Sequence, residues 1–494
     1  MTMKKIFFPI LLIVLTGLIS CEGYLDINED PTAPTDATII DLLPSGQAAC
    51  AFGLANQLNR AASDNVQYLS GRYDSWAISP DDLSNAWRFS LYAGGLKDLQ
   101  IVIEKATESG NFHFAGVAKL MQAYTFSIMV DVWDDIPYSE ALNNEILHPV
   151  FDDASSIYDN LLALIDEGIA DLDRDLPDLP ADMRDADLIF SGNLNKWKKM
   201  GYTLKLKMYN QIRLVDASTA KSNIESLVSS GNLISANADD FLFQFGSSTT
   251  PSNQHPGYQN DYTVKGEAYI NSHFYEVMQD NFDPRLPYFF YRQDGTFDGR
   301  YTGDPTPTGN DDDTRTVQGL YSVGGKYDDS SEESVGSNSA AGDGRFRMVT
   351  NVMRLFIECE AALALEANVS DTPENLFRKA LEANFAEINS LDAPNISETA
   401  KDNYINARIT LFNEAANNDD KLAIVMEDKW ITSFGNALEA YNDYRRTGYP
   451  VLPPPLVASN NVVSNRFPYP SDELSANSNA PAQPLNNVKV FWDN

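Results

Sequence analysis

The sequence predicts a mainly α-helical protein in which about four tetratricopeptide-like helix pairs form a scaffold, with a long, irregular, loop-rich insertion and little β-structure. Three observations support this. Segments whose apolar residues lie three or four positions apart recur in pairs along most of the chain. Each pair covers roughly 34–45 residues, a length typical of tetratricopeptide-like repeats. The stretch 246–347 is rich in Gly, Ser, Asp, Thr, Pro and Tyr and lacks this spacing.

The first twenty residues have the pattern of a signal peptide. Lys4 and Lys5 precede an apolar run at 6–19, an order typical of secretory signals. This run of about 14 residues is short for a membrane span. The tetrapeptide Leu-Ile-Ser-Cys at 18–21 resembles the lipobox of bacterial lipoproteins, which predicts cleavage before Cys21 and acylation of its thiol. The alternative is an ordinary secretory signal that ends near a Cys by chance.

Residues 21–40 are acidic, contain proline and lack periodicity, so we expect a lipidated tether that leads into a body at 41–494. The net charge of −34 would become −36 after cleavage, because segment 1–20 carries Lys4 and Lys5 and no acidic residue. Such a charge argues against nucleic acid and anionic bilayers as partners. We therefore expect membrane contact through the lipid anchor only, since several acyl chains anchor stably.

The remaining cysteines and the four histidines give no sign of a metal or cofactor. Cys50 and Cys359 lie in apolar helical segments, which favours buried free thiols over a disulfide. The histidines are not spaced as metal ligands. Glycine-rich nucleotide-binding motifs and the nucleophile-elbow motif do not occur. We therefore predict no zinc site and no cofactor, while an oxygen-rich calcium site at the Asp clusters 134–135 or 311–313 is the alternative that the sequence leaves open.

Within the body, a first helix is predicted at 41–58, and the scaffold at 91–245 and 348–446. The predicted helix pairs are 91–107 with 114–133, 154–172 with 194–214, 351–367 with 373–388, and 399–415 with 421–444. The insertion at 246–347 should hold short helices and a small hairpin, because so long a structureless loop is improbable in a compact body. The C-terminal stretch 447–494 has no helical period and is expected to wrap over the helices.

Six sequence blocks resemble, in this order behind the lipobox, those of the SusD/RagB family of nutrient-binding outer-membrane lipoproteins. They lie at 24–31, 91–99, 135–142, 283–287, 429–450 and 466–474. The longest contains Asn-Ala-Leu-Glu-Ala-Tyr-Asn-Asp-Tyr-Arg-Arg-Thr-Gly-Tyr-Pro. The resemblance covers nearly the whole chain after the signal segment.

This resemblance implies a lipid-anchored, surface-exposed protein of the cell outer membrane. Such proteins have four tetratricopeptide-like helix pairs, and loops on the opposite side of the molecule form their ligand site. They cap a SusC-like TonB-dependent transporter and deliver oligosaccharides or, in some members, peptides. The ligand loops vary most within the family, so the ligand's identity does not carry over.

Sugar binding needs flat aromatic faces together with amide, carboxylate or guanidinium groups for the hydroxyls. Two aromatic and polar segments, 65–87 and the insertion, supply such side chains. The candidate ligand residues are Asn65, Tyr68, Tyr73, Asp74, Trp76, Tyr258, Tyr262 and Tyr321. The alternative for each is packing in the core, which we expect for Trp87.

Four functions are consistent with these patterns. The first is a glycan-binding lipoprotein that works with a transporter, and the second is a peptide-binding member of the same family. The third is a lipid-anchored glycoside hydrolase, and the fourth is a scaffold that holds partner proteins. Glycosidases need two carboxylates at a fixed separation, whereas Asp134-Asp135 and the Asp triplet at 311–313 have the pattern of turns and loops. We therefore predict a binding protein and no enzyme.

Overall fold

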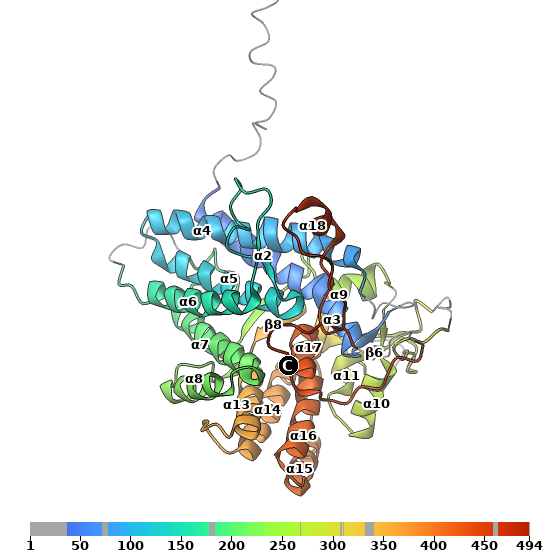
Figure 1. Cartoon of the computed structure of the whole chain (residues 1–494). Helices are drawn as coiled ribbons and strands as arrows, with labels where there is room; N and C mark the ends of the chain where they lie inside the picture. The colour runs from blue at the N-terminus through green and yellow to red at the C-terminus, as the bar shows by residue number, and fades with distance from the viewer. Residues whose placement is uncertain are drawn as a thin grey trace, which may run out of the picture.

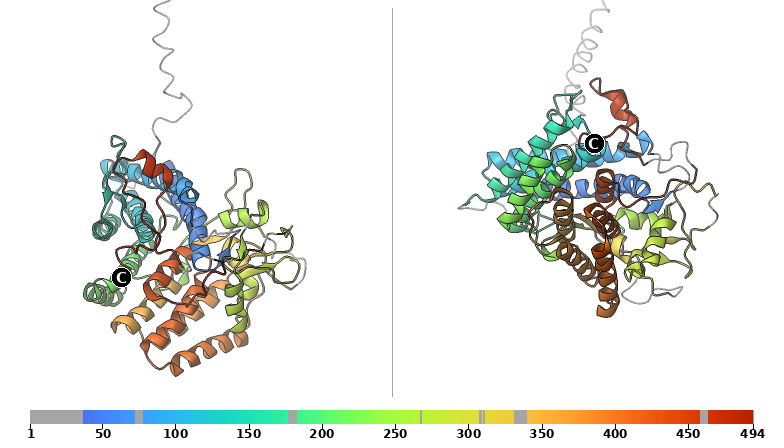
Figure 2. Two further views of the ribbon diagram at one scale, coloured as in Figure 1. Left: turned by 45° about the vertical axis from the view of Figure 1, so that its right-hand side comes forward. Right: turned by 60° about the horizontal axis from the view of Figure 1, so that its bottom comes forward.

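The predicted helix pairs are present and stack on one another in the computed structural model (Figures 1 and 2). It describes residues 37–71, 78–176, 183–266, 268–306, 309, 311–330, 340–457 and 463–493. The paired helices are α4 (Lys97–Glu108) with α5 (Phe112–Trp133), α6 (Ala154–Leu172) with α7 (Leu194–Gln211), α13 (Asn351–Leu365) with α14 (Pro373–Ile388), and α15 (Glu398–Glu414) with α16 (Asn418–Thr432). The mainly α-helical fold is confirmed. Within the described residues, no helix is long and apolar enough to cross a bilayer.

Helix α5 is buried over nearly its whole circumference and lies between α4 and α6. Glycines let it approach α6 closely, because a Cβ added to Gly116 would lie only 2.7 Å from the backbone oxygen of Gly168. Side-chain caps define where several helices begin. Asp153 accepts a hydrogen bond from a backbone N–H at the start of α6, and Asn193 does so for α7.

Several helical features differ from the sequence prediction. The predicted helix at 91–107 begins within the π-helix η3 (Ala86–Leu96), and the C-terminal stretch contains the short helix α18 (Ser471–Ala476). The first helix runs beyond residue 58, as α2 (Ile39–Gly53), the π-helical turn η1 (Leu54–Leu58) and α3 (Asn59–Asn65). Helix α8 (Ala217–Ser230) was not predicted. The predicted helix at 421–444 is two helices, because α16 ends at Thr432 and α17 (Ala437–Thr447) follows a break.

The break before α17 has a local cause. Gly435 has a φ of 96°, which L side chains rarely adopt. Asn436 then caps α17, because its side-chain oxygen accepts a hydrogen bond from the backbone N–H of Glu439. The apolar spacing of the predicted helix continued across this break, so the period alone did not reveal it.

The β-structure consists of four short antiparallel pairs. The strands are β1 (Leu69–Ser70) with β5 (Tyr269–Ile270), β2 (Ile136–Pro137) with β3 (Phe151–Asp152), β4 (Phe241–Gln244) with β8 (Arg345–Val349), and β6 (Phe290–Arg292) with β7 (Thr316–Gln318). Strands β4 and β8 flank the predicted insertion, and Phe243 pairs with Phe346. The chain therefore leaves the scaffold and returns to it at one place.

Between these strands the chain forms short elements rather than a structureless loop. They are α9 (Pro256–Tyr258), the π-helical turn η6 (Gln259–Thr263), α10 (Ser272–Asp280), α11 (Leu286–Phe289) and α12 (Leu320–Val323). In Figure 1 they lie to one side of the stacked helices, and α9 packs against η1.

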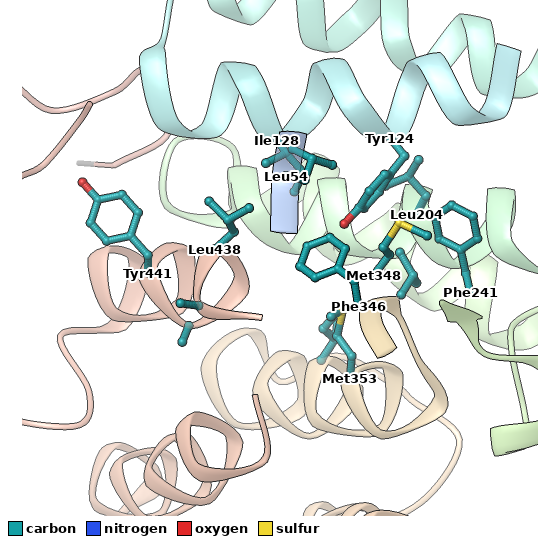
Figure 3. Packing of buried hydrophobic residues seen from close by; sticks show 14 of the residues in the cluster. Leu54, Tyr124, Ile128, Leu204, Phe241, Phe346, Met348, Met353, Leu438 and Tyr441 are labelled. Atoms are coloured by element: carbon teal, nitrogen blue, oxygen red, sulfur yellow. The ribbon is translucent and has the colours of Figure 1, made fainter. Parts of the chain in front are cut away.

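The core joins the scaffold to the β4–β8 pair. Figure 3 shows Tyr124 and Ile128 from α5 above Phe346 and Met348 from β8, with Leu438 of α17 beside them. All five side chains are buried. Cys50 and Cys359 are also buried and unpaired, as predicted, and burial raises the pKa of the Cys50 thiol to about 12.

The C-terminal segment contacts the far end of α5. Phe467 donates its backbone N–H to the carbonyl oxygen of Val132 at 2.7 Å, and the indole of buried Trp492 donates to Asp131 at 3.0 Å. Asp134, in the turn after α5, accepts a hydrogen bond from the backbone N–H of Phe491 at 2.7 Å. Asp134 therefore lies in the turn after α5, as its sequence context indicated, but its carboxylate links that turn to the C-terminal segment.

Candidate functional site

A small cavity lies between the π-helical turn η1 and the α9–η6 segment. Its volume is about 60 Å³. The lining residues are Ala55, Asn56, Asn59, Arg60, Leu69, His255, Pro256, Gly257, Asn260 and Gln318. Three segments far apart in the sequence therefore meet here, which is typical of a site rather than of a local turn.

Both walls of this cavity contain π-helical turns, η1 on one side and η6 on the other. Asn56 in η1 has φ −93° and ψ −105°, well outside the helical region. Such turns occur often at functional sites, and unusual backbone conformations cluster there as well. The backbone thus marks this cavity as a candidate binding site.

His255 forms part of the cavity wall and is 2 % exposed. Its Nδ1 accepts a hydrogen bond from the backbone N–H of Gly257 at 3.1 Å, so the neutral ring carries its proton on Nε2. Burial, with a smaller contribution from Arg347, lowers the pKa of His255 to about 3. The Nε2–H donor is buried and has no hydrogen-bond partner in the described part of the chain.

The walls are held in place by hydrogen bonds behind them. Asp261 accepts from the backbone N–H of Gln318 at 3.2 Å and from its side-chain Nε2–H at 3.0 Å. The Tyr262 hydroxyl donates to the carbonyl oxygen of Gln318 at 2.8 Å. On the opposite wall, Asn59 Oδ1 accepts from the backbone N–H of Ala437 at 2.7 Å. Burial raises the pKa of the Asp261 carboxyl to about 6.

Two of the sequence-predicted tyrosines lie on the segment that forms one wall. Tyr258 and Tyr262 stack with ring centroids 4.8 Å apart and an interplanar angle of 13°. Both are partly buried, and Tyr258 sits between cavity residues Gly257 and Asn260 in the chain. The two tyrosines therefore lie on the segment that borders the cavity, but neither lines it, and their role in ligand binding stays a prediction.

Asn65, Tyr68 and Tyr321 lie instead in the core. The Asn65 amide donates to the carbonyl oxygen of Ala61 at 2.9 Å. Tyr68 is 1 % exposed, and its ring stacks on Trp430 at 5.6 Å. Tyr321 is equally buried, and its ring stacks on Phe289. Because these side chains offer no free face to a ligand, we withdraw all three as candidate ligand residues.

Four further predicted residues, Cys21, Tyr73, Asp74 and Trp76, lie outside the described residues, so their roles remain predictions. His255, Asn56 and Asn59 were not predicted as site residues. A lone histidine and scattered amides on a helix carry no distinctive local pattern, and only the tertiary contacts bring them together.

Two larger hollows adjoin each other at α4, with volumes of about 420 and 640 Å³. Lys97, Leu142 and Asn144 line both, and Lys97 Nζ donates to the carbonyl oxygen of Leu142 at 2.5 Å. On the same helix, Lys105 donates to the carbonyl oxygen of Ala37 at 2.8 Å. Helix α4 therefore borders both hollows and also contacts Ala37, the first described residue. Trp87 lines the smaller hollow, but it is buried, as expected.

Several solved structures share this fold. A chitin-binding SusD homolog from Flavobacterium johnsoniae matches with a TM-score of 0.73 and 18% identity, over 92% of this chain and 98% of its own. A SusD homolog from Bacteroides uniformis matches with a TM-score of 0.72 and 18% identity, over 93% and 100%. A structure described as a chitin-binding protein matches with a TM-score of 0.70 and 23% identity, over 92% and 100%. These likenesses show the fold.

No curated protein matches the sequence. The sequence model of one protein family, however, matches residues 31–470. That family is described as starch-binding and associating with the outer membrane. Because this match covers most of the chain, the protein belongs to the SusD-like family.

Proposed function

We propose that this protein is a lipid-anchored cell-surface protein that captures an oligosaccharide and delivers it to a SusC-like TonB-dependent transporter of the outer membrane. One observation carries the binding part of this proposal. The cavity between η1 and η6 is lined by the amide side chains of Asn56, Asn59 and Asn260, and the α9–η6 segment that forms one wall carries a stacked tyrosine pair. Uncharged hydrogen-bonding groups and aromatic faces together suit a sugar.

The same cavity supports binding without catalysis. Its lining includes no Asp or Glu side chain. Glycoside hydrolysis needs two carboxylates, one on each side of the scissile bond and roughly 5–10 Å apart. Asp261, which follows the lining residue Asn260 in the chain, is buried and accepts a hydrogen bond from Gln318. We therefore propose a binding protein that leaves its ligand intact.

The anchor and the partner complete the proposal. Acylation of Cys21 would hold the body at the membrane. The first described residue, Ala37, accepts a hydrogen bond from Lys105 of α4, and Figure 1 shows α4 and α9 in different parts of the molecule. The cavity would then stay accessible to glycans while the anchored side meets the transporter. Membership of a family described as associating with the outer membrane supports this arrangement.

Isothermal titration calorimetry of the mature protein against a panel of polysaccharides and a pool of peptides tests the function. We expect an oligosaccharide to bind. Tyr258→Ala should weaken binding by about 1–3 kcal/mol, because the tyrosine ring would stack on the sugar. The matched control is Tyr209→Ala, because Tyr209 lies on α7 and does not line the cavity. Trp76→Ala tests the stacking residue predicted from sequence in the same way.

Further measurements test the rest of the proposal. A SusC-like barrel should copurify with the protein from detergent-solubilised membranes, and Cys21→Ser should release the protein from them. Reducing sugar that is still released after extensive purification would instead indicate a hydrolase. Tight binding of peptides with no binding of any glycan would overturn the proposed ligand class.

A further inference from the structure

We propose that the smaller of the two hollows at α4, called here the Trp87 hollow, binds part of this chain's own tether, the acidic and apolar stretch 24–30. This inference is independent of the ligand proposed above and concerns how the anchored body is held at the membrane. Three features carry it: the lining of the hollow, the composition of the tether and the place where the described chain begins.

The Trp87 hollow has the size and the lining of a binding site. Its volume of about 420 Å³ lies within the range of roughly 300–1,000 Å³ that is typical of ligand pockets. Three parts of the chain form its wall: η3 with the start of α4, the stretch 137–149 and the stretch 470–476 with α18. Most of the lining is apolar or aromatic, as at Tyr92 and Leu142. Such a wall favours the burial of aliphatic side chains.

Arg88 and Lys97 give this wall two cations without an anionic partner. The Arg88 side chain is exposed, and its guanidinium lies over the ring of Phe89, 5.0 Å from the centroid. Lys97 donates to a neutral acceptor, the carbonyl oxygen of Leu142. Neither cation forms an ion pair with another described residue. Both are therefore available to an acidic occupant.

The carboxylates of the wall already have partners. Asp472 and Glu473 lie in the first turn of α18, where the helix dipole favours negative charge. Glu473 also accepts hydrogen bonds from the indole of Trp87 at 3.2 Å and from the amide of Asn477 at 2.9 Å. The charges of the hollow that remain for an occupant are thus the two cations.

The tether matches both parts of the wall. Residues 22–36 include no Lys, Arg or His. Five of them are acidic: Glu22, Asp26, Glu29, Asp30 and Asp36. Its large apolar residues are Tyr24, Leu25 and Ile27. Successive side chains of an extended segment point to opposite sides, so Leu25 and Ile27 would enter the apolar wall together and leave Asp26 at the rim for the cations.

The described chain begins close enough for the tether to reach the hollow. Ala37 accepts a hydrogen bond from Lys105 of α4 at 2.8 Å. Lys97, in the wall of the hollow, lies eight residues earlier on the same helix, a distance of about 12 Å at a rise of 1.5 Å per residue. Ile27 precedes Ala37 by ten residues, which span up to about 33 Å. The tether is thus long enough.

Docking would shorten the link between the lipid and the body. With Tyr24 bound in the hollow, three residues at 21–23 would remain between the acyl chains and the body. The end of the molecule with α4 and α18, which Figure 1 shows on one side, would then face the membrane. Because the tether belongs to the same chain, its effective concentration at the hollow is about millimolar, so a weak contact suffices.

Disulfide cross-linking in a redox buffer tests this inference on the mature chain with Cys21→Ser. Ile27→Cys is combined with Ala93→Cys, at an exposed residue in the wall of the hollow. The matched control pair combines Ile27→Cys with Thr107→Cys, at an exposed residue of α4 two positions after Lys105. Position 107 is nearer than position 97 to the contact of α4 with the start of the described chain.

We expect the pair at 27 and 93 to show an effective concentration at least about tenfold higher than the control pair, because docking holds residue 27 at the hollow. Cys50 and Cys359 are fully buried and do not compete for the new thiols. Thermal unfolding checks that each variant is folded.

Two further substitutions locate the contact. Leu25→Asn removes an aliphatic side chain from the tether, and Arg88→Gln removes an exposed cation from the wall. Each should lower the effective concentration of the pair at 27 and 93 at least about threefold and leave the control pair unchanged. Thr35→Asn, in the tether outside 24–30, is the matched control and should change neither pair.

Several outcomes would overturn the inference. Equal effective concentrations for the two pairs would mean that the tether does not dock in the Trp87 hollow. A preference for position 93 that neither Leu25→Asn nor Arg88→Gln lowers would mean that the hollow's own side chains do not cause it. In native membranes, cross-linking of Ala93→Cys to a barrel protein in place of Ile27→Cys would assign the hollow to the transporter. None of these results bears on glycan binding, which the calorimetry above measures separately.

Discussion

Glu360 provides a sharp test of how the two halves of the scaffold are joined. Its side chain is fully buried and accepts hydrogen bonds from Arg213 Nε at 3.0 Å and from Arg446 Nε and Nη2 at 2.7 and 2.8 Å. Glu360→Gln would leave these two guanidinium groups without their shared anion. Breaking a buried ion pair from one side typically costs about 3–5 kcal/mol of unfolding free energy. We expect a loss in this range.

Urea denaturation of the mature protein at neutral pH measures the change. The matched control is Lys198→Gln, which breaks a partly exposed pair with Asp173 at 2.7 Å and should cost below about 1 kcal/mol. A Glu360→Gln variant no less stable than this control would refute the reasoning, since the buried network would then contribute nothing beyond a surface pair.

The pH dependence follows from the same contacts. Burial on its own would raise the pKa of Glu360, but Arg446 and Arg213 outweigh it and hold that pKa well below its usual range. A carboxylate with a lowered pKa stabilises fully above the unfolded-state pKa of about 4.3 and loses this effect as the pH falls below it. The difference between wild type and Glu360→Gln should therefore shrink under acid conditions, as denaturation at stepped pH would show.

Three other changes have equally definite expectations. Because burial raises the pKa of Asp261 to about 6, the contribution of this residue to stability should fall as the pH rises from about 4 to 6. The stability difference between wild type and Asp261→Asn, measured by urea denaturation at stepped pH, should change across this range, and a constant difference would contradict it. Gly116→Ala should lower the melting temperature by several degrees, because the new Cβ would lie 2.7 Å from the Gly168 oxygen; a neutral effect would mean that α5 and α6 can separate freely. Trp492→Ala should lower the free energy of unfolding by about 3–5 kcal/mol, because the indole is buried and donates a hydrogen bond to Asp131. A loss below about 1 kcal/mol in denaturant unfolding would show that the C-terminal segment does not stabilise the body.

The helix pairs could be predicted because their signal is local. In α5, apolar residues recur at helical spacing over 22 residues, and so long a pattern is not typical of a strand or a loop. The break before α17 depends on the single residue Gly435, whose positive φ the apolar pattern does not reveal. Helix α8 was missed because few of its residues are buried and the apolar signal is weak.

The site was harder to predict because burial of an aromatic residue depends on distant partners. Tyr68 contacts Trp430, more than three hundred positions away in the sequence. Tyr258, in contrast, stacks on Tyr262 within its own turn and stays partly exposed. Both tyrosines stand in similar aromatic and polar segments, so local composition could not distinguish the buried residue from the partly exposed one.

The break before α17 also places the cavity. Asn59 in the cavity wall is held by the first backbone N–H of α17, that of Ala437. The neighbouring Asn436 donates its side-chain amide to the carbonyl oxygen of Arg347 in β8, at 2.7 Å. One interrupted helix thus fixes both the η1 wall and the strand through which the insertion returns to the scaffold. A continuous helix at 421–444 would have matched the apolar pattern, but it would have removed the cap at Asn436 and with it the hydrogen bonds that hold Asn59 and β8 in place.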